Sequence, residues 1–122
     1  MKSFAAALAA AVLLLGPVSA RADKSQCLLG RLCLWQHADF EGGFIQYLGN
    51  DSNYGNNNFD NGVALGDHAS SVCNATGRTA FLYEHDSHGG HGFFLAPSGP
   101  LACFADLDIL GFDDQLSSHF LF

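Results

Sequence analysis

The sequence predicts an all-β fold in which two Greek-key motifs pack as a β-sandwich. Composition is the first indication, because 14 Gly and 11 Phe accompany only 14% charged residues. Such a chain is too apolar for disorder and too poor in Lys, Glu and Arg for a helical bundle. The second indication is a series of short aromatic and branched segments bounded by Gly, Asn, Asp or Pro. The third is an internal repeat, and a chain of 122 residues holds one such domain at most.

The first 22 residues have the pattern of a secretory signal peptide. Lys2 precedes an apolar run over residues 4–15, and Ala20 and Ala22 provide the small residues of a cleavage site. A membrane anchor is the alternative, but the run is too short to span a bilayer core. We expect residues 1–22 to be removed and residues 23–122 to form a single secreted, extracellular domain.

The charge balance restricts the partners. Five Lys and Arg stand against 12 Asp and Glu, a net charge of −7, and loss of Lys2 and Arg21 with the signal makes it 3 − 12 = −9. A surface of this sign repels nucleic-acid phosphates and anionic lipids and attracts cations. We expect no nucleic-acid or membrane partner and, in the absence of another long apolar segment, a soluble monomer.

All four cysteines follow the cleavage site, and an even number in a small secreted chain favours two disulfides. Four cysteines allow three connectivities, which the sequence does not decide. We favour Cys27 with Cys33 across a short loop, and Cys73 with Cys103 across a longer one. A zinc site is the alternative, but the chain has no C-x-x-C pair.

The internal repeat relates the two halves of the chain. Residues 34–37 (LWQH) align with residues 82–85 (LYEH) at an offset of 48, and the alignment places Gly42 on Gly90. The strings GDHASS and DDQLSS align at an offset of 47. Each half therefore contains an aromatic strand end, a Gly turn, a second strand, a long polar loop and a D-x-x-S-S turn before a last strand.

Strands are predicted where runs of aromatic and branched residues lie between turn residues. The expected strands are 32–36, 43–48, 71–75, 79–84, 92–96 and 117–122, with short pairing segments near 63–65 and 102–105 and a single helical turn within 104–110. Four strands per half with one long return connection form a Greek key, the first over about 31–76 and the second over about 78–122. The expected inward-facing side chains are Leu34, Phe44, Val72, Phe81, Phe93 and Phe120.

These motifs resemble the βγ-crystallin domain, in the form shared with secreted microbial proteins classed as peptidase inhibitor family I36. The resemblance covers roughly residues 27–122. CLWQHADFEGGF is similar to the family's aromatic-x4-aromatic-x-Gly hairpin through Trp35, Phe40 and Gly42. LYEHDSHGGHGF is the second copy, with His88 where an aromatic residue is usual. The resemblance implies a βγ-crystallin-type β-sandwich.

Each half then ends in a string similar to the family's calcium signature, Asn/Asp-Asn/Asp-x-x-Ser/Thr-Ser. DDQLSS at 113–118 matches in full, whereas GDHASS at 66–71 has Gly66 at the first position. Ca²⁺ prefers six to eight hard oxygen ligands in flexible geometry, which such a turn can supply. A plain polar turn, with Asp and Ser bonded to nearby backbone N–H groups, is the alternative.

Two ligand sets follow, and we expect weak calcium affinity and a fold that forms without metal. The stronger site takes the side chains of Asp113, Asp114 and Ser117 and the carbonyl of Gln115, with Ser118 bonding the turn. The resemblance adds the carbonyl of Gln36 from the hairpin of the other key. By the same reasoning, the weaker site takes Asp67, the carbonyl of His68, the hydroxyl of Ser70 and the carbonyl of Glu84.

Other features have ordinary explanations. His85, His88 and His91 could bind Zn²⁺ or Cu²⁺, but three-residue steps alternate faces on a hairpin, and solvated histidines explain them. The loop over 49–62 holds six Asn and reads as an exposed connection. Asn74-Ala75-Thr76 is an N-glycosylation sequon, meaningful in a eukaryotic source.

The sequence favours a binding protein and not an enzyme, because it carries no nucleophile motif, no phosphate-binding Gly loop before a helix and no H-E-x-x-H. The leading hypothesis is a secreted, disulfide-stabilised, calcium-binding βγ-crystallin-like protein. The resemblance implies a second hypothesis, an inhibitor of an extracellular peptidase, above all a metallopeptidase. A killer-toxin-like antimicrobial protein is a third, and its acidic surface gives it no attraction to anionic membranes.

Overall fold

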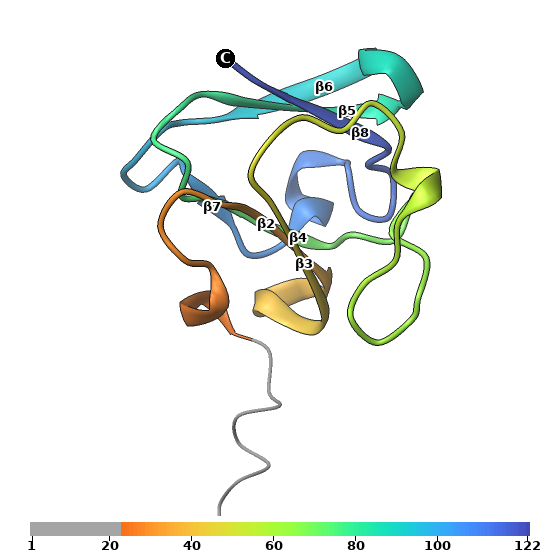
Figure 1. Ribbon diagram of the computed structural model, residues 1–122, viewed down its shortest axis with the longest axis horizontal. Helices are drawn as coiled ribbons and strands as arrows, with labels where there is room; N and C mark the ends of the chain where they lie inside the picture. The colour runs from red at the N-terminus through yellow and green to blue at the C-terminus, as the bar shows by residue number, and fades with distance from the viewer. Residues whose placement is uncertain (1–22) are drawn as a thin grey trace, which may run out of the picture.

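The computed structural model describes residues 23–122, which form two antiparallel sheets stacked as the layers of a sandwich (Figure 1). The predicted signal peptide at residues 1–22 lies outside the described residues. The first sheet has the order β3-β2-β4-β7, and the second has the order β6-β5-β8. Their strands are β2 (Leu32–His37), β3 (Glu41–Tyr47), β4 (Ser71–Asn74), β5 (Ala80–His85), β6 (Gly89–Leu95), β7 (Cys103–Phe104) and β8 (Ser118–Leu121). The predicted all-β sandwich is confirmed.

The helices in the described part of the chain are single 3₁₀ turns, and none of them is long and apolar enough to cross a membrane. One of them lies within the turn predicted over 104–110. They are η2 (Lys24–Gln26), η3 (Ala38–Phe40), η4 (Tyr54–Asn56), η5 (Asp86–His88) and η6 (Leu107–Leu110).

Each half of the chain contributes a segment to the sheet of the other half. β7 belongs to the second half but pairs with β4 of the first sheet, placing Cys103 opposite Cys73. In return, Asp51 of the first half forms a bridge with His119 of β8. The predicted pairing segment near 102–105 is therefore present, whereas the one near 63–65 contributes only an isolated bridge from Ala64. Because of this exchange, neither half completes its sheet alone.

Aliphatic side chains fill the space between the sheets. Leu34 and Val72 are buried there as predicted, and Phe93 packs against them from the second sheet. The other large buried aliphatic members of this core are Leu32, Leu65, Leu82, Leu95, Leu107, Leu116 and Leu121.

The prediction that Phe44, Phe81 and Phe120 point inward is wrong. Phe44 lies on the outer face of the first sheet beside Trp35. On the second sheet, Leu82 and Leu121 face the core. Phe81 and Phe120 directly precede them in the chain and therefore face outward. Side chains alternate along a strand, so an error of one position exchanges the faces. Both faces of these sheets are apolar, and alternation therefore did not distinguish inside from outside.

The outer face of the first sheet is covered by the segment before β2. Trp35 is fully buried, and its indole N–H donates to Gln26 Oε1 at 3.0 Å. The disulfides are Cys27–Cys33 and Cys73–Cys103, the pairing favoured from the sequence. Since Cys33 lies opposite Cys73 in the sheet, the two bridges share one patch of this face.

His119 is fully buried in the second half and is held on both sides of its ring. The Tyr54 hydroxyl lies 2.7 Å from Nδ1, and the Gly49 carbonyl lies 2.7 Å from Nε2. A neutral ring with its proton on Nε2 satisfies both bonds, since the carbonyl can only accept. Burial lowers the pKa of His119 below its ordinary value. The histidine therefore joins the long loop to β8 as an uncharged group.

We predict that this histidine makes the fold sensitive to mild acid. A folded-state pKa below the unfolded value means that the unfolded chain binds the extra proton, so stability is complete above about pH 6.5 and is lost as the pH falls below it. Urea unfolding at pH 7, 6 and 5 should show this decline, and His119→Gln should flatten it. The exposed His37→Gln is the control and should keep the wild-type slope. An unchanged slope in His119→Gln would contradict the assignment.

Candidate functional site

Residues 67–71 and 114–118, called the serine turns below, occupy equivalent places in the two halves. Each begins with an aspartate in the left-handed region, Asp67 at φ 60° and Asp114 at φ 56°. The hairpins that precede them also match, because Asp39 and Ser87 both have φ near 60°. The backbone thus repeats at the same offsets as the sequence.

The two serine turns bond to each other reciprocally. The Ser117 hydroxyl donates to Asp67 Oδ1 at 2.9 Å, and the Ser70 hydroxyl donates to Asp114 Oδ1 at 3.3 Å. The backbone N–H groups of the same aspartates donate to the carbonyls of Leu116 and Ala69. Each aspartate is therefore positioned by the opposite half of the chain.

The second serine of each turn forms hydrogen bonds with the hairpin of its own half. The Ser71 hydroxyl donates to the His37 carbonyl at 2.7 Å and accepts from the Phe40 N–H at 3.1 Å. Ser118 makes the same pair of bonds, to the His85 carbonyl and the His88 N–H. The expectation that Ser118 bonds its own turn is wrong, because its hydroxyl bonds the β5–β6 hairpin. Both serines have structural roles.

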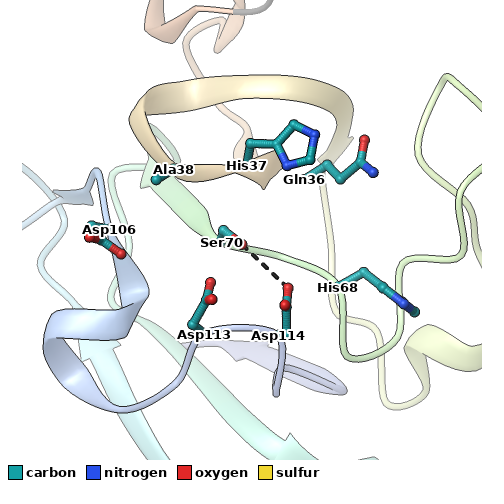
Figure 2. A pocket seen from close by; sticks show the side chains of 8 residues that line it. All are labelled: Gln36, His37, Ala38, His68, Ser70, Asp106, Asp113 and Asp114. Carbon is teal, nitrogen blue, oxygen red and sulfur yellow. Dashed lines mark hydrogen bonds between the residues drawn. The ribbon is translucent and has the colours of Figure 1, made fainter.

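A pocket lies between the β2–β3 hairpin and the two serine turns (Figure 2). Asp113 and Asp114 point toward the hairpin from one side, with Ser70 between hairpin and aspartates and Asp106 at the edge. Asp113 Oδ1 is buried and lacks a hydrogen-bond partner. A buried carboxylate oxygen without a partner is costly, and a bound cation would relieve that cost. The lining of this first pocket is Gln36, His37, Ala38, His68, Ser70, Asp106, Asp113 and Asp114.

The second pocket is the counterpart of the first. Its lining is Asp67, Glu84, His85, Asp114 and Gln115. Gly66 stands where the first pocket has Asp113, so the corresponding carboxylate is missing. A Cβ at Gly66 would meet nothing closer than 3.6 Å, which is ordinary van der Waals contact.

The side chains of Gln36 and Glu84 turn away from the pockets toward their own hairpins. Gln36 Oε1 accepts from the Gly43 N–H at 3.1 Å, and Glu84 Oε2 accepts from the His91 N–H at 2.8 Å. The His91 N–H lowers the pKa of Glu84. The side-chain oxygens of these two residues are therefore engaged by their hairpins. The His68 ring likewise points away from the aspartates in Figure 2 and bonds the Gly66 carbonyl.

The structure groups the predicted ligands differently from the sequence-based partition. Gln36, His68 and Ser70 share the first pocket with Asp113 and Asp114. Glu84 and Gln115 share the second pocket with Asp67, whose carboxylate binds the Ser117 hydroxyl. The sequence analysis assigned each serine to the aspartate of its own turn. In the folded chain, each serine instead bonds the aspartate of the other turn.

Apart from His37 and His68 in the first pocket and His85 in the second, the donors of both pockets are mainly hard oxygen atoms. Among residues 23–122, no three His, Cys, Asp or Glu side chains are arranged to hold a metal ion by themselves. A cation here would need hydroxyl and carbonyl oxygens beside the carboxylates. This mixture suits Ca²⁺ and does not suit Zn²⁺ or Cu²⁺.

Asp106 is a site residue that the sequence analysis missed. It caps η6, where its Oδ1 accepts from the Asp108 N–H at 3.0 Å, and it also lines the first pocket. An Asp immediately before a short apolar turn is a capping signal that was available in the sequence. Its nearness to Asp113 was not available, because it depends on how η6 lies against the serine turns.

The histidine segment does not gather three rings at one point. His91 Nδ1 lies 3.1 Å from Glu84 Oε2 and His85 Nε2 lies 3.8 Å from it, but both rings are largely exposed. His88 packs against Tyr83 and Phe120 instead.

The sequon asparagine is not available for glycosylation in the folded chain. Asn74 is buried at 4% exposure, and its amide donates to the carbonyls of Arg78 and Ala96 at 2.6 and 3.0 Å.

Solved structures of several βγ-crystallins resemble this fold. A domain solved in a study of the evolution of the eye-lens βγ-crystallin fold is 24% identical, with a TM-score of 0.64, over 77% of this chain and 86% of that one. A βγ-crystallin from Ciona intestinalis is 21% identical, with a TM-score of 0.60, over 76% of this chain and all of that one. IPSE/alpha-1 from Schistosoma mansoni eggs is 18% identical, with a TM-score of 0.56, over 77% and 86%. At these identities the likeness shows the fold alone.

The sequence itself has a closer relationship to one family. No curated protein matches the chain significantly. The family model of peptidase inhibitor family I36 matches residues 20–95, more than half of the chain, including the first hairpin, the first serine turn and β5 with β6. Together with the βγ-crystallin sandwich, this match shows that the chain belongs to peptidase inhibitor family I36.

Proposed function

We propose that this chain is a secreted, non-catalytic peptidase inhibitor whose two Greek keys are held together by Ca²⁺ at the serine turns. Membership of the I36 family supports inhibition, and the two disulfides suit an extracellular protein. The acidic first pocket supports calcium.

The observation that carries calcium binding is the unpartnered buried Oδ1 of Asp113 in the first pocket. Beside it lie the Asp114 carboxylate and the Ser70 hydroxyl, which come from opposite halves of the chain. With the carbonyls of Gln36 and His68, these residues form a hard donor set for Ca²⁺. Bound calcium would neutralise the aspartates and cross-link the two keys. The second pocket would use Asp67, Ser117, Gln115 and Glu84, with weaker affinity because Gly66 supplies no carboxylate.

The observation that favours inhibition, beyond the family itself, is the rigid covalent framework of the first sheet. A peptidase cleaves a flexible segment and is blocked by one that is already fixed in a bound shape. Cys33 and Cys73 are buried neighbours in the sheet, and each ties a more exposed segment to it. The domain therefore has the rigidity that inhibition requires.

We predict that calcium stabilises the folded chain through the first pocket. A ligand at a hundredfold excess over Kd raises the free energy of unfolding by about 2.7 kcal/mol, on the order of a 10 °C rise in Tm for a domain of this size. Thermal melting with and without millimolar calcium measures the rise. Asp114→Asn with Ser70→Ala should abolish most of it.

The matched control is Asp108→Asn, which removes one exposed charge from η6 outside both pockets and should keep the full calcium response. The pair Asp67→Asn and Ser117→Ala should reduce the response less than the first-pocket pair does. A wild-type Tm that is indifferent to calcium would overturn the metal proposal.

Gly66→Asp is expected to strengthen the second pocket. It places a carboxylate at the position equivalent to Asp113, and its Cβ meets only ordinary contacts. Calorimetric titration should show tighter calcium binding at one of two sites. Gly66→Ala supplies the Cβ without the charge and is the control. Equal binding by the two variants would show that the first position does not contribute a ligand.

The inhibitor proposal predicts that the oxidised protein over residues 23–122 blocks at least one extracellular peptidase at micromolar concentration. A panel of thermolysin-like, serine and cysteine peptidases tests it, with reduced protein as the comparison. We expect inhibition of a metallopeptidase and slow cleavage of the inhibitor itself. Digestion by every member of the panel without inhibition of any would end this proposal.

A further inference from the structure

The loop closed by Cys27–Cys33 displays the most exposed large apolar side chain in the described part of the chain. Leu29 is 93% exposed and its neighbour Leu28 is 57% exposed. Contact with water of this extent is unfavourable for a leucine, although single exposed leucines occur on many protein surfaces. Here two such side chains are adjacent in a loop whose cysteines are only six positions apart, so the loop presents a small apolar tip.

The tip has a fixed shape. The Arg31 N–H donates to the Leu28 carbonyl at 3.2 Å and closes a four-residue turn. Gly30 occupies the third position of that turn at φ 91°, the conformation in which a type II turn favours glycine. Leu29 therefore occupies the second position, where its side chain points out of the turn.

The tip is also attached to the rigid part of the domain. The Gly30 N–H donates to the Ala75 carbonyl at 2.7 Å, and the Ala75 N–H donates to the Arg31 carbonyl at 2.8 Å. Cys33 holds the other end of the loop from the centre of the first sheet, where it is fully buried. A disulfide, a turn and two cross-loop hydrogen bonds thus restrict the short segment between Cys27 and Cys33.

A third exposed leucine lies nearby. Leu101 is 56% exposed on the loop before β7, and the neighbouring Ala102 carbonyl accepts from the Asn74 N–H, next to Ala75. The Gly30–Ala75 and Asn74–Ala102 hydrogen bonds place both loops at the end of β4, whereas Ser70 of the first pocket precedes the start of that strand. The apolar tip therefore belongs to the disulfide end of the domain and not to the serine turns.

We infer that the Cys27–Cys33 loop is the peptidase-contacting segment of this inhibitor, with Leu29 inserted into a specificity pocket that accepts large apolar side chains. This rests on the proposed inhibitory function. An endopeptidase that selects leucine or phenylalanine offers such a pocket, and thermolysin is the probe of that class. Burial of a nearly fully exposed leucine on binding releases apolar surface from water, while the fixed turn reduces the entropy lost on association.

The test compares inhibition constants for thermolysin among single variants of the oxidised protein. Leu29→Ser should weaken inhibition at least tenfold, as expected for a central contact residue. Ile109→Ser is the matched control, because Ile109 is 83% exposed on η6 at another part of the surface, and it should leave inhibition unchanged. Gly30→Ala meets no atom within 4 Å and strains only the backbone of the turn, so it should also weaken inhibition.

The outcomes separate the two proposals. Inhibition by the wild type that Leu29→Ser and Ile109→Ser both preserve would overturn the loop assignment and leave the inhibitory function standing. An equal loss in both variants would also overturn it, since any exposed apolar side chain would then serve. A wild type that inhibits no peptidase of the panel would remove the inhibitory function and this assignment with it. Cleavage of Gly30→Ala after residue 28 or 29, with the wild type resistant there, would support the loop directly.

Discussion

The two serine turns are joined to each other by hydrogen bonds, and the arrangement of the sandwich depends on that contact. Ser117 bonds the carboxylate of Asp67, Ser70 bonds that of Asp114, and the two aspartate N–H groups cross between the same turns. These hydrogen bonds satisfy the hydroxyls of Ser70 and Ser117, which are buried. Each aspartate is positioned by the opposite key, so the first pocket is a consequence of joining the keys and does not exist in either key by itself.

The two halves share a backbone but differ in what they place on it. The first half covers its outer face with the segment over 23–31 and holds it with disulfides, so Trp35 is fully buried. The second half leaves an aromatic outer face, in which Phe81 contacts Phe94 and Phe122 and lies against Tyr83. The pockets differ in the same way, with Asp113 in one and Gly66 in the other. A duplicated fold has thus kept its hydrogen-bond scaffold and varied the side chains that do not contribute to it.

The contacts that join the two keys and the loop that exposes Leu28 and Leu29 lie in different parts of the domain. The serine turns at one side join the keys, and the buried His119 anchors the long polar loop there through Gly49 and Tyr54. The disulfides lie on the first sheet and fix a short loop that carries Leu28 and Leu29 to the surface. Such a separation allows the exposed loop to vary in sequence without affecting the core, since its contacts with the sheet are made by backbone atoms and a cystine.

The sequence by itself determined the all-β class, the repeat and the strand positions, because turn residues and runs of aromatic and branched residues are local properties of the chain. It favoured the disulfide pairing that the structure shows, but left three connectivities open. It also identified the residues of the serine turns, since their spacing repeats. Tertiary structure decided which serine faces which aspartate, which face of each sheet carries the aromatic side chains, and that Asp106 joins the first pocket. Those features arise from contacts between segments about 50 residues apart, such as Ser117 with Asp67. A local sequence pattern cannot predict these contacts, because both keys carry the same motif and both faces of a sheet are apolar.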